Sequence, residues 1–153
     1  MYLAFYENRY GGILDRVIRW KTATWKQRFN GSWKDLPSHC ELVFSDGMMF
    51  SASSRENIVR FKKHSFTGKA WDRIELCTNK EKDIREWCET KEGLKYDYLG
   101  VLGFVIPFIK DRKNRWFCSE ICSEALKQFN IIYIDDSSNV SPVKLNNIIK
   151  VKK

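Results

Sequence analysis

A strict alternation of side chains on either side of an Asp-Gly pair constrains the fold most strongly. Residues 38–44 and 48–53 flank Asp46-Gly47, which supplies the positive φ that a tight turn needs. Because successive side chains of a strand point to opposite faces, His39 and Glu41 should share one face. The other face would carry Cys40, Leu42 and Phe44. The segment therefore predicts two neighbouring antiparallel strands.

The rest of the chain predicts an α+β fold. Further strands are expected at 2–7, 57–62 and 72–78, from β-prone or alternating side chains. Helical periodicity predicts helices at 13–20, 80–92, 97–107 and 118–126, with Asn79 capping the second and a last short helix starting at Ser141-Pro142. The stretch 21–37 lacks periodicity, so we expect a loop there, long enough to form the rim of a site.

Length and composition predict one domain spanning residues 1–153. A chain of 153 residues with 43% hydrophobic content can bury a sizeable core without disulfides or metal. No apolar run approaches the roughly 18 residues of a membrane span. The first residues lack a secretory signal, and five cysteines without a disulfide-framework spacing favour reduced thiols, so we expect a cytoplasmic protein. Cys118 and Cys122 have no second Cys or His pair nearby, which disfavours zinc.

The charge leaves two interpretations open. A formal net charge of +8 with 14% aromatic residues is compatible with binding nucleic acid or an anionic membrane surface. Aromatic and basic residues gather around Trp20, Trp25, Lys26 and Trp33, and residues 110–115 form a basic connector. Lys and Arg are nevertheless scattered among Asp and Glu over most of the chain, and a high content of Lys, Asn and Ile is also typical of a nucleotide composition bias.

Cys118 is the candidate nucleophile. It opens a predicted helix, where unpaired amides and the positive end of the helix dipole favour a thiolate and can form an oxyanion hole. The chain has two histidines to serve as base, His39 and His64, and His64 lies in a polar Lys-Lys-His-Ser context. We therefore expect His39 to be the base. The alternative is that Cys118 is only a small buried hydrophobic residue.

A third group should hold the imidazole tautomer and stabilise its cation. Glu41, on the same predicted face as His39, is one candidate. Ser51 or Ser53 on the partner strand could orient the ring instead. His39 and Glu41 could also be a plain surface pair.

Four short motifs occur in a defined order: His-Cys-Glu-Leu-Val-Phe at 39–44, Phe-Ser-Ala-Ser at 50–53, Lys-Tyr-Asp-Tyr-Leu-Gly at 95–100 and Trp-Phe-Cys-Ser-Glu at 116–120. This ordered set resembles the circularly permuted NlpC-type branch of the papain-like superfamily. That branch includes YiiX/YaeF-like hydrolases and small phage-encoded members, and it is related to lecithin:retinol acyltransferase-like enzymes. Its members place the His before the Cys, as this chain does.

The resemblance implies a papain-like fold with a central antiparallel sheet packed against helices. It implies Cys118 as nucleophile, His39 as base and, less firmly, Glu41 as the third member. Tyr96 or Tyr98 would lie near the oxyanion. The remaining candidates for a third member or the pocket are Ser51, Ser53 and Ser119.

The chemistry implied is a cysteine hydrolase, an amidase or peptidase that forms a thioester and needs no cofactor or metal. Its substrate would be a peptide, a cell-wall peptide or a lipid, and a phage-encoded member would act in the host cytoplasm. Two other functions stay open. One is a lipid-directed acyltransferase or thioesterase of the same fold, and the other is a non-catalytic basic module that binds nucleic acid or a host protein.

Overall fold

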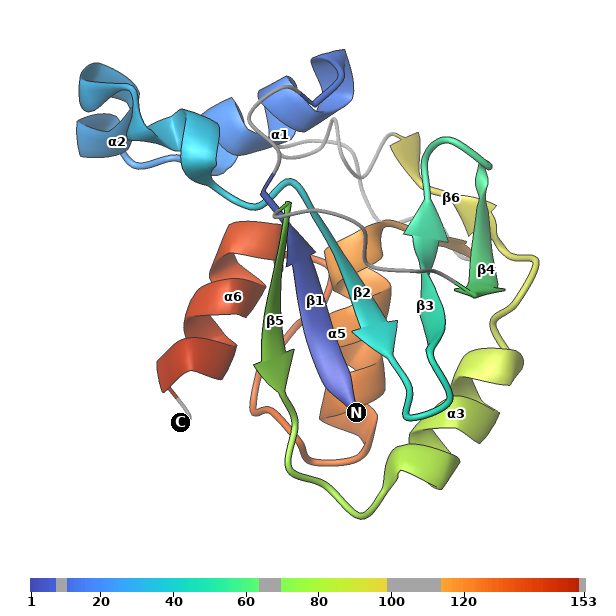
Figure 1. The fold of residues 1–153 in the computed structure, drawn as a ribbon. Coiled ribbons are helices and arrows are strands. Elements are labelled where there is room, and N and C mark those ends of the chain that lie inside the picture. The colour runs from blue at the N-terminus through green and yellow to red at the C-terminus, as the bar shows by residue number, and fades with distance from the viewer. Residues whose placement is uncertain (8–10, 64–69, 99–113, 152–153) are drawn as a thin grey trace.

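A seven-stranded sheet forms the centre of the computed structural model, which describes residues 1–7, 11–63, 70–98 and 114–151 (Figure 1). The strand order is β5-β1-β2-β3-β4-β6-β7. Neighbouring strands are antiparallel except the last pair, β6 and β7. The strands are β1 (Tyr2–Tyr6), β2 (His39–Val43), β3 (Met48–Ser53), β4 (Ile58–Lys63), β5 (Trp71–Glu75), β6 (Lys95–Tyr96) and β7 (Arg115–Trp116).

Helices stand against and beside this sheet, which confirms the predicted α+β class. They are α1 (Ile13–Thr22), α2 (Trp25–Asn30), the short 3-10 helix η1 (Ser32–Asp35), α3 (Glu81–Glu89), α5 (Cys118–Gln128) and α6 (Pro142–Val151). Helix α5 packs on β2 and β3, while α1 and α2 lie beyond one end of the sheet (Figure 1).

The hairpin between β2 and β3 forms as the sequence predicts. Gly47 adopts a φ of 81°, which a residue with a side chain rarely tolerates. The Asp46 carboxylate accepts a hydrogen bond from the Met48 amide at 3.0 Å, and the Phe44 amide donates to the Met48 carbonyl at 2.9 Å. These bonds fix the register that pairs Leu42 with Phe50.

The register places alternate residues of the strands on two very different faces. Leu3, Leu42 and Phe50 point toward α5 and are fully buried in the main core. The opposite face of β2, β3 and β4 carries His39, Glu41, Ser51, Ser53 and Arg60, together with a small apolar cluster around Val43 and Met49. The main core extends along the chain from Leu3 to Ile149.

The prediction of a loop over 21–37 is wrong, because this stretch contains α2 and η1. Thr24 caps α2: its hydroxyl accepts from the Gln27 amide at 3.3 Å, and the Gln27 side chain accepts from the Thr24 amide at 2.9 Å. Gly31 then ends the helix with a φ of 77°. The capping box and this glycine are visible in the sequence. The helix was missed because it is short and buries none of its residues.

Other differences are small shifts of element ends. Helix α3 begins at Glu81 with Lys80, rather than Asn79, as its N-cap, and it ends at Glu89 before a turn at Gly93. The helix expected at 97–107 lies largely outside the described residues, as does His64. Within the described part of the chain, no helix is both long and apolar enough to cross a membrane.

Candidate active site

Cys118 is the first residue of α5, as the sequence predicts. Phe117 has an extended backbone and precedes the helix, and its carbonyl accepts the first helical hydrogen bond, from the Ile121 amide at 3.1 Å. Glu120 reinforces this start, because its carboxylate accepts from the Phe117 amide at 3.2 Å. Amides in the first turn of a helix have no partner within the helix. The Cys118 sulfur is therefore next to the positive end of the α5 dipole.

Helix α5 places the Cys118 side chain against the start of β2. The sulfur lies next to the imidazole of His39 and the thiol of Cys40, and both groups shift its pKa. One turn along α5, Cys122 packs on the same strand, with its sulfur 3.8 Å from the Cys40 carbonyl oxygen. Two segments far apart in the sequence thus bring together the predicted nucleophile and the predicted base.

Glu41 holds the other side of the imidazole. Its Oε1 lies 2.9 Å from Nε2 of His39, so Nδ1 is the ring nitrogen left for the sulfur. The two predicted serine alternatives have other partners. Ser51 donates to the Cys40 carbonyl at 2.8 Å, and the Ser53 hydroxyl accepts from the Glu56 amide at 3.3 Å.

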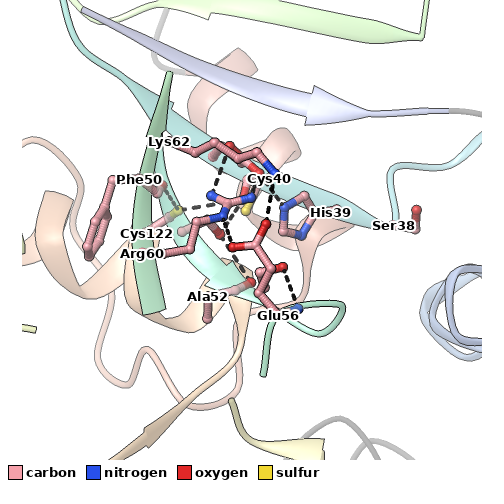
Figure 2. A network of polar contacts seen from close by, with 12 residues as sticks. Ser38, His39, Cys40, Phe50, Ala52, Glu56, Arg60, Lys62 and Cys122 are labelled. Atoms are coloured by element: carbon pink, nitrogen blue, oxygen red, sulfur yellow. Dashed lines mark hydrogen bonds and ion pairs between the residues drawn. The ribbon is translucent and has the colours of Figure 1, made fainter. Parts of the chain in front are cut away.

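Two charged residues that the sequence analysis did not single out extend this chain of contacts. Arg60 on β4 lies 3.0 Å from Oε1 of Glu41 and 3.1 Å from Oε2 of Glu56. Lys62 also binds Glu56, at 2.8 Å. Figure 2 shows Arg60, Lys62 and Glu56 converging close to the His39 ring. Arg60 could have been identified from the strand register, because its pairing with Ser51 puts it on the face that carries Glu41.

These contacts shift the pKa values of the base and its carboxylate in opposite directions. Burial alone would lower the pKa of His39, but the charge of Cys118 and the hydrogen bonds that the ring donates to Cys118 and Glu41 raise it to about 10. Burial alone would raise the pKa of Glu41, but His39 and Arg60 lower it to about 2. At neutral pH the pair is therefore an imidazolium and a carboxylate.

The thiol is shifted toward thiolate. A hydrogen bond from the Cys40 thiol lowers the pKa of Cys118 well below its usual range; burial opposes this, and the charge and hydrogen bond of His39 reinforce it. The pKa of Cys40 shifts in the opposite direction, because burial and the neighbouring thiols raise it. Cys40 therefore stays protonated and acts as a hydrogen-bond donor to Cys118.

A cavity of about 400 Å³ opens on the polar face of the sheet. Its described wall includes His39, Glu41 and Arg60, with Trp71 and Tyr96 among its aromatic residues. Cys118 does not belong to that wall, and it is only 2% exposed. His39 both borders the cavity and contacts the sulfur, so the imidazole separates Cys118 from the cavity.

The remaining predicted site residues fall into different places. Tyr96 lines the cavity and is buried close to Cys118, and burial raises the pKa of its hydroxyl, which stays neutral. Tyr98 does not line the cavity: it is 41% exposed, its ring centre lies 4.9 Å from that of Tyr96, and its hydroxyl donates to the Ser54 carbonyl at 2.5 Å. Ser119 is fully buried behind Cys118, and its hydroxyl has no hydrogen-bond partner among the described residues.

No protein-family model, curated protein or solved structure significantly matches this chain. In the described ranges, no group of three or more His, Cys, Asp or Glu side chains is arranged to hold a metal ion.

Proposed function

We propose that this protein is a cysteine hydrolase, an amidase or peptidase, in which Cys118 attacks a carbonyl carbon and His39 transfers the protons. One observation carries the proposal: the sulfur at the start of α5 lies beside the His39 imidazole, whose Nε2 is 2.9 Å from the Glu41 carboxylate. This is the arrangement that activates a thiol and fixes the orientation of its base. The permuted papain-like fold expected from the four motifs is part of the proposal.

The reaction follows from the protonation states at the site. The Cys118 thiolate attacks the carbonyl carbon, and the electron pair of the C=O bond moves to oxygen. The imidazolium of His39 gives the Nδ1 proton to the leaving nitrogen as the C–N bond breaks, which leaves a thioester on Cys118. His39, now neutral, then removes a proton from water, and the hydroxide attacks the thioester to release the acid and restore the thiolate.

Two groups support the intermediates. First-turn amides of α5 point toward the sulfur end of the helix and are the donors available to the oxyanion. Glu41, held by Arg60, stays ionised and keeps Nε2 of His39 engaged throughout the cycle. Because Arg60 also binds Glu56, the carboxylate is held from outside the reacting pair.

Substrate access requires movement beside His39. Cys118 is 2% exposed, whereas the cavity borders the imidazole directly. A substrate held in the cavity therefore reaches the sulfur only when the wall around His39 opens. We expect this opening to limit the rate with bulky substrates more than with small ones.

An acyl-transfer assay tests the proposal without knowledge of the natural substrate. The protein is incubated with p-nitrophenyl acetate, and the acetylated residue is identified by peptide mass spectrometry. We expect a burst of nitrophenolate and an acetyl group on Cys118. Turnover should be lost in Cys118→Ala and His39→Gln and retained in Cys77→Ser, the matched control at an exposed thiol. Acetylation of Cys77 alone, with turnover unchanged in Cys118→Ala, would refute the proposal.

A panel of peptide amides and long-chain acyl esters then separates the amidase from the lipid-directed acyltransferase. An amidase predicts faster turnover of the peptide amides. Faster turnover of the acyl esters, with Cys118 still required, would move the assignment to the lipid-directed enzyme.

A further inference from the structure

Two large aromatic side chains stand almost entirely in solvent on α2. Trp25 is 81% exposed and Phe29 is 96% exposed. They are four residues apart on one helix, so they lie on the same side of it. Figure 1 shows α2 at the outer end of the arm formed with α1, away from the sheet. Isolated exposed apolar residues are ordinary, but an adjacent aromatic pair at the tip of a projection marks an interaction surface.

Basic side chains surround this pair. Residues 13–35 contain six Lys or Arg and two Asp; the basic residues are Arg16, Arg19, Lys21, Lys26, Arg28 and Lys34. Arg19 is buried and donates to the Lys34 carbonyl at 2.9 Å, so the others supply the surface charge. One of the two acids, Asp15, is bound by the Gly12 amide and by Ser38, close to the body of the protein.

The arm is held in one shape before anything binds. Arg28 of α2 reaches back to α1, where its guanidinium donates to the carbonyls of Trp20 and Lys21 at 2.9 and 3.0 Å. The same guanidinium lies 4.4 Å from the centre of the Trp20 ring. These contacts fix α2 against α1, so presenting Trp25 and Phe29 requires little further ordering.

We propose that this surface, comprising Trp25, Phe29 and the basic residues Lys21, Lys26, Arg28 and Lys34, docks on anionic phospholipid bilayers. Trp and Phe insert at the level of the lipid headgroups, while Lys and Arg contact the phosphates. A convex projection with outward aromatic side chains suits a soft, flat bilayer. A nucleic acid would instead need a groove that follows its backbone.

The docking surface shares α1 with the cavity. Leu14, Asp15 and Ile18 of α1 line that cavity, and α2 follows directly after α1. A docked protein would therefore hold the cavity close to the bilayer. The docking itself does not depend on the proposed hydrolase activity, so either can fail alone.

Vesicle flotation tests the proposal. The full chain is mixed with vesicles of phosphatidylcholine containing about one third phosphatidylglycerol, or of phosphatidylcholine alone, at about 50 and 500 mM salt. We expect flotation with the anionic vesicles at low salt, and at least a tenfold lower partition coefficient in Trp25→Ala/Phe29→Ala. Lys26→Glu should lower it by about fivefold or more. The matched controls are Tyr133→Ala and Lys82→Glu, at side chains that are similarly exposed elsewhere, and they should float like the wild type.

Three results would overturn the proposal. The first is unchanged flotation of Trp25→Ala/Phe29→Ala, with its thermal unfolding midpoint intact. The second is a dimer that forms without lipid in sedimentation analysis and is lost in this double variant. That result would make the surface a contact between two copies. The third is tighter binding to single-stranded DNA than to anionic vesicles, lost in the same variant, which would make it a nucleic-acid surface.

Discussion

The two faces of β2 and β3 are both largely buried, but their side chains have different chemistry. On one face, Leu42 and Phe50 pack against α5 with no exposed surface. On the other, Glu41 and Arg60 form an ion pair that is 5% and 12% exposed. Apolar burial stabilises a fold directly, whereas a buried ion pair roughly offsets its own desolvation. The comparison teaches that the polar face sets protonation states, and that its contribution to stability depends on both partners of each pair being present and charged.

Helix α5 joins these two environments within one turn. Cys122 lies in the main core, where its sulfur is 3.8 and 4.0 Å from the carbonyl oxygens of Cys40 and Phe50. Cys118, one turn earlier, meets the imidazole of His39 at the edge of the polar face. Both cysteines belong to the main core, but only Cys118 has a chemical role in the proposed function.

The largest effect is expected from a substitution that removes one charge from the polar face without changing the size of the side chain. Glu41→Gln keeps the size of the side chain but removes the charge that holds Nε2 of His39. We expect acyl transfer from p-nitrophenyl acetate to fall by about 10³- to 10⁴-fold, as when the carboxylate of a catalytic triad is neutralised. The free energy of unfolding serves as the control. Activity within tenfold of wild type would show that Glu41 does not position the base.

A substitution in the apolar face should have the opposite result: it should lower the free energy of unfolding and leave acyl transfer unchanged. Phe50→Ala removes a fully buried ring packed 4.9 Å from the ring of Phe61. The free energy of unfolding in urea should fall by about 3–5 kcal/mol. Acyl transfer per folded molecule should stay near the wild-type value, and Tyr133→Ala, at an exposed ring, should change neither quantity. Loss of activity without loss of stability would contradict this division of roles.

The pH dependence of the free energy of unfolding is the smallest of the expected effects, and it tests the comparison of the two faces further. Between pH 6.5 and 9 the unfolded pair carries one proton, on the thiol, and the folded pair also carries one, on His39. Below pH 6.5 the unfolded imidazole takes up a second proton, and above pH 9 the unfolded thiol loses its proton while the folded His39 keeps its own up to about pH 10. Stability should therefore decline on both sides of this window.

Denaturation of wild type and Cys118→Ala/His39→Gln at each pH isolates the contribution of the pair. The difference should change by up to about 1.4 kcal/mol per pH unit outside the window. Glu41 adds a separate loss as the pH falls from 4.5 toward 2, since its pKa is about 2 in the folded protein. A difference that falls steadily from pH 6.5 to 9 would show that the folded pair carries two protons, so that the thiol is not ionised in the folded state.

The strands, the turn and the helix start that carry the site were predicted from the sequence, because each depends on residues that are neighbours in the chain. Alternation placed His39 and Glu41 on one face, the Asp46-Gly47 turn fixed the hairpin, and Cys118 opens a helix as expected. The role of Arg60 depends on the register between β3 and β4, which no single strand encodes. Helix α2 was missed because it is short and buries no side chain.

The pairing of Cys118 with His39 was expected from the choice between two histidines and from the resemblance, and no local pattern encodes the contact itself. Composition and spacing alone favour a small buried structural thiol at Cys118. The docking of α5 on β2 brings Cys118 next to His39. That contact joins distant parts of the chain and depends on the packing of the whole core.

The most direct test of the account is the pH profile of Cys118 alkylation by iodoacetamide, with peptide mapping to resolve it from the other thiols. Burial slows the reaction at every pH, so the shape of the profile carries the information rather than the absolute rate. The account predicts a rate that stays nearly constant from pH 8 to pH 6 in the wild type and falls about tenfold per pH unit in His39→Gln. A wild-type rate that already falls tenfold per unit below pH 8, unchanged in His39→Gln, would contradict it.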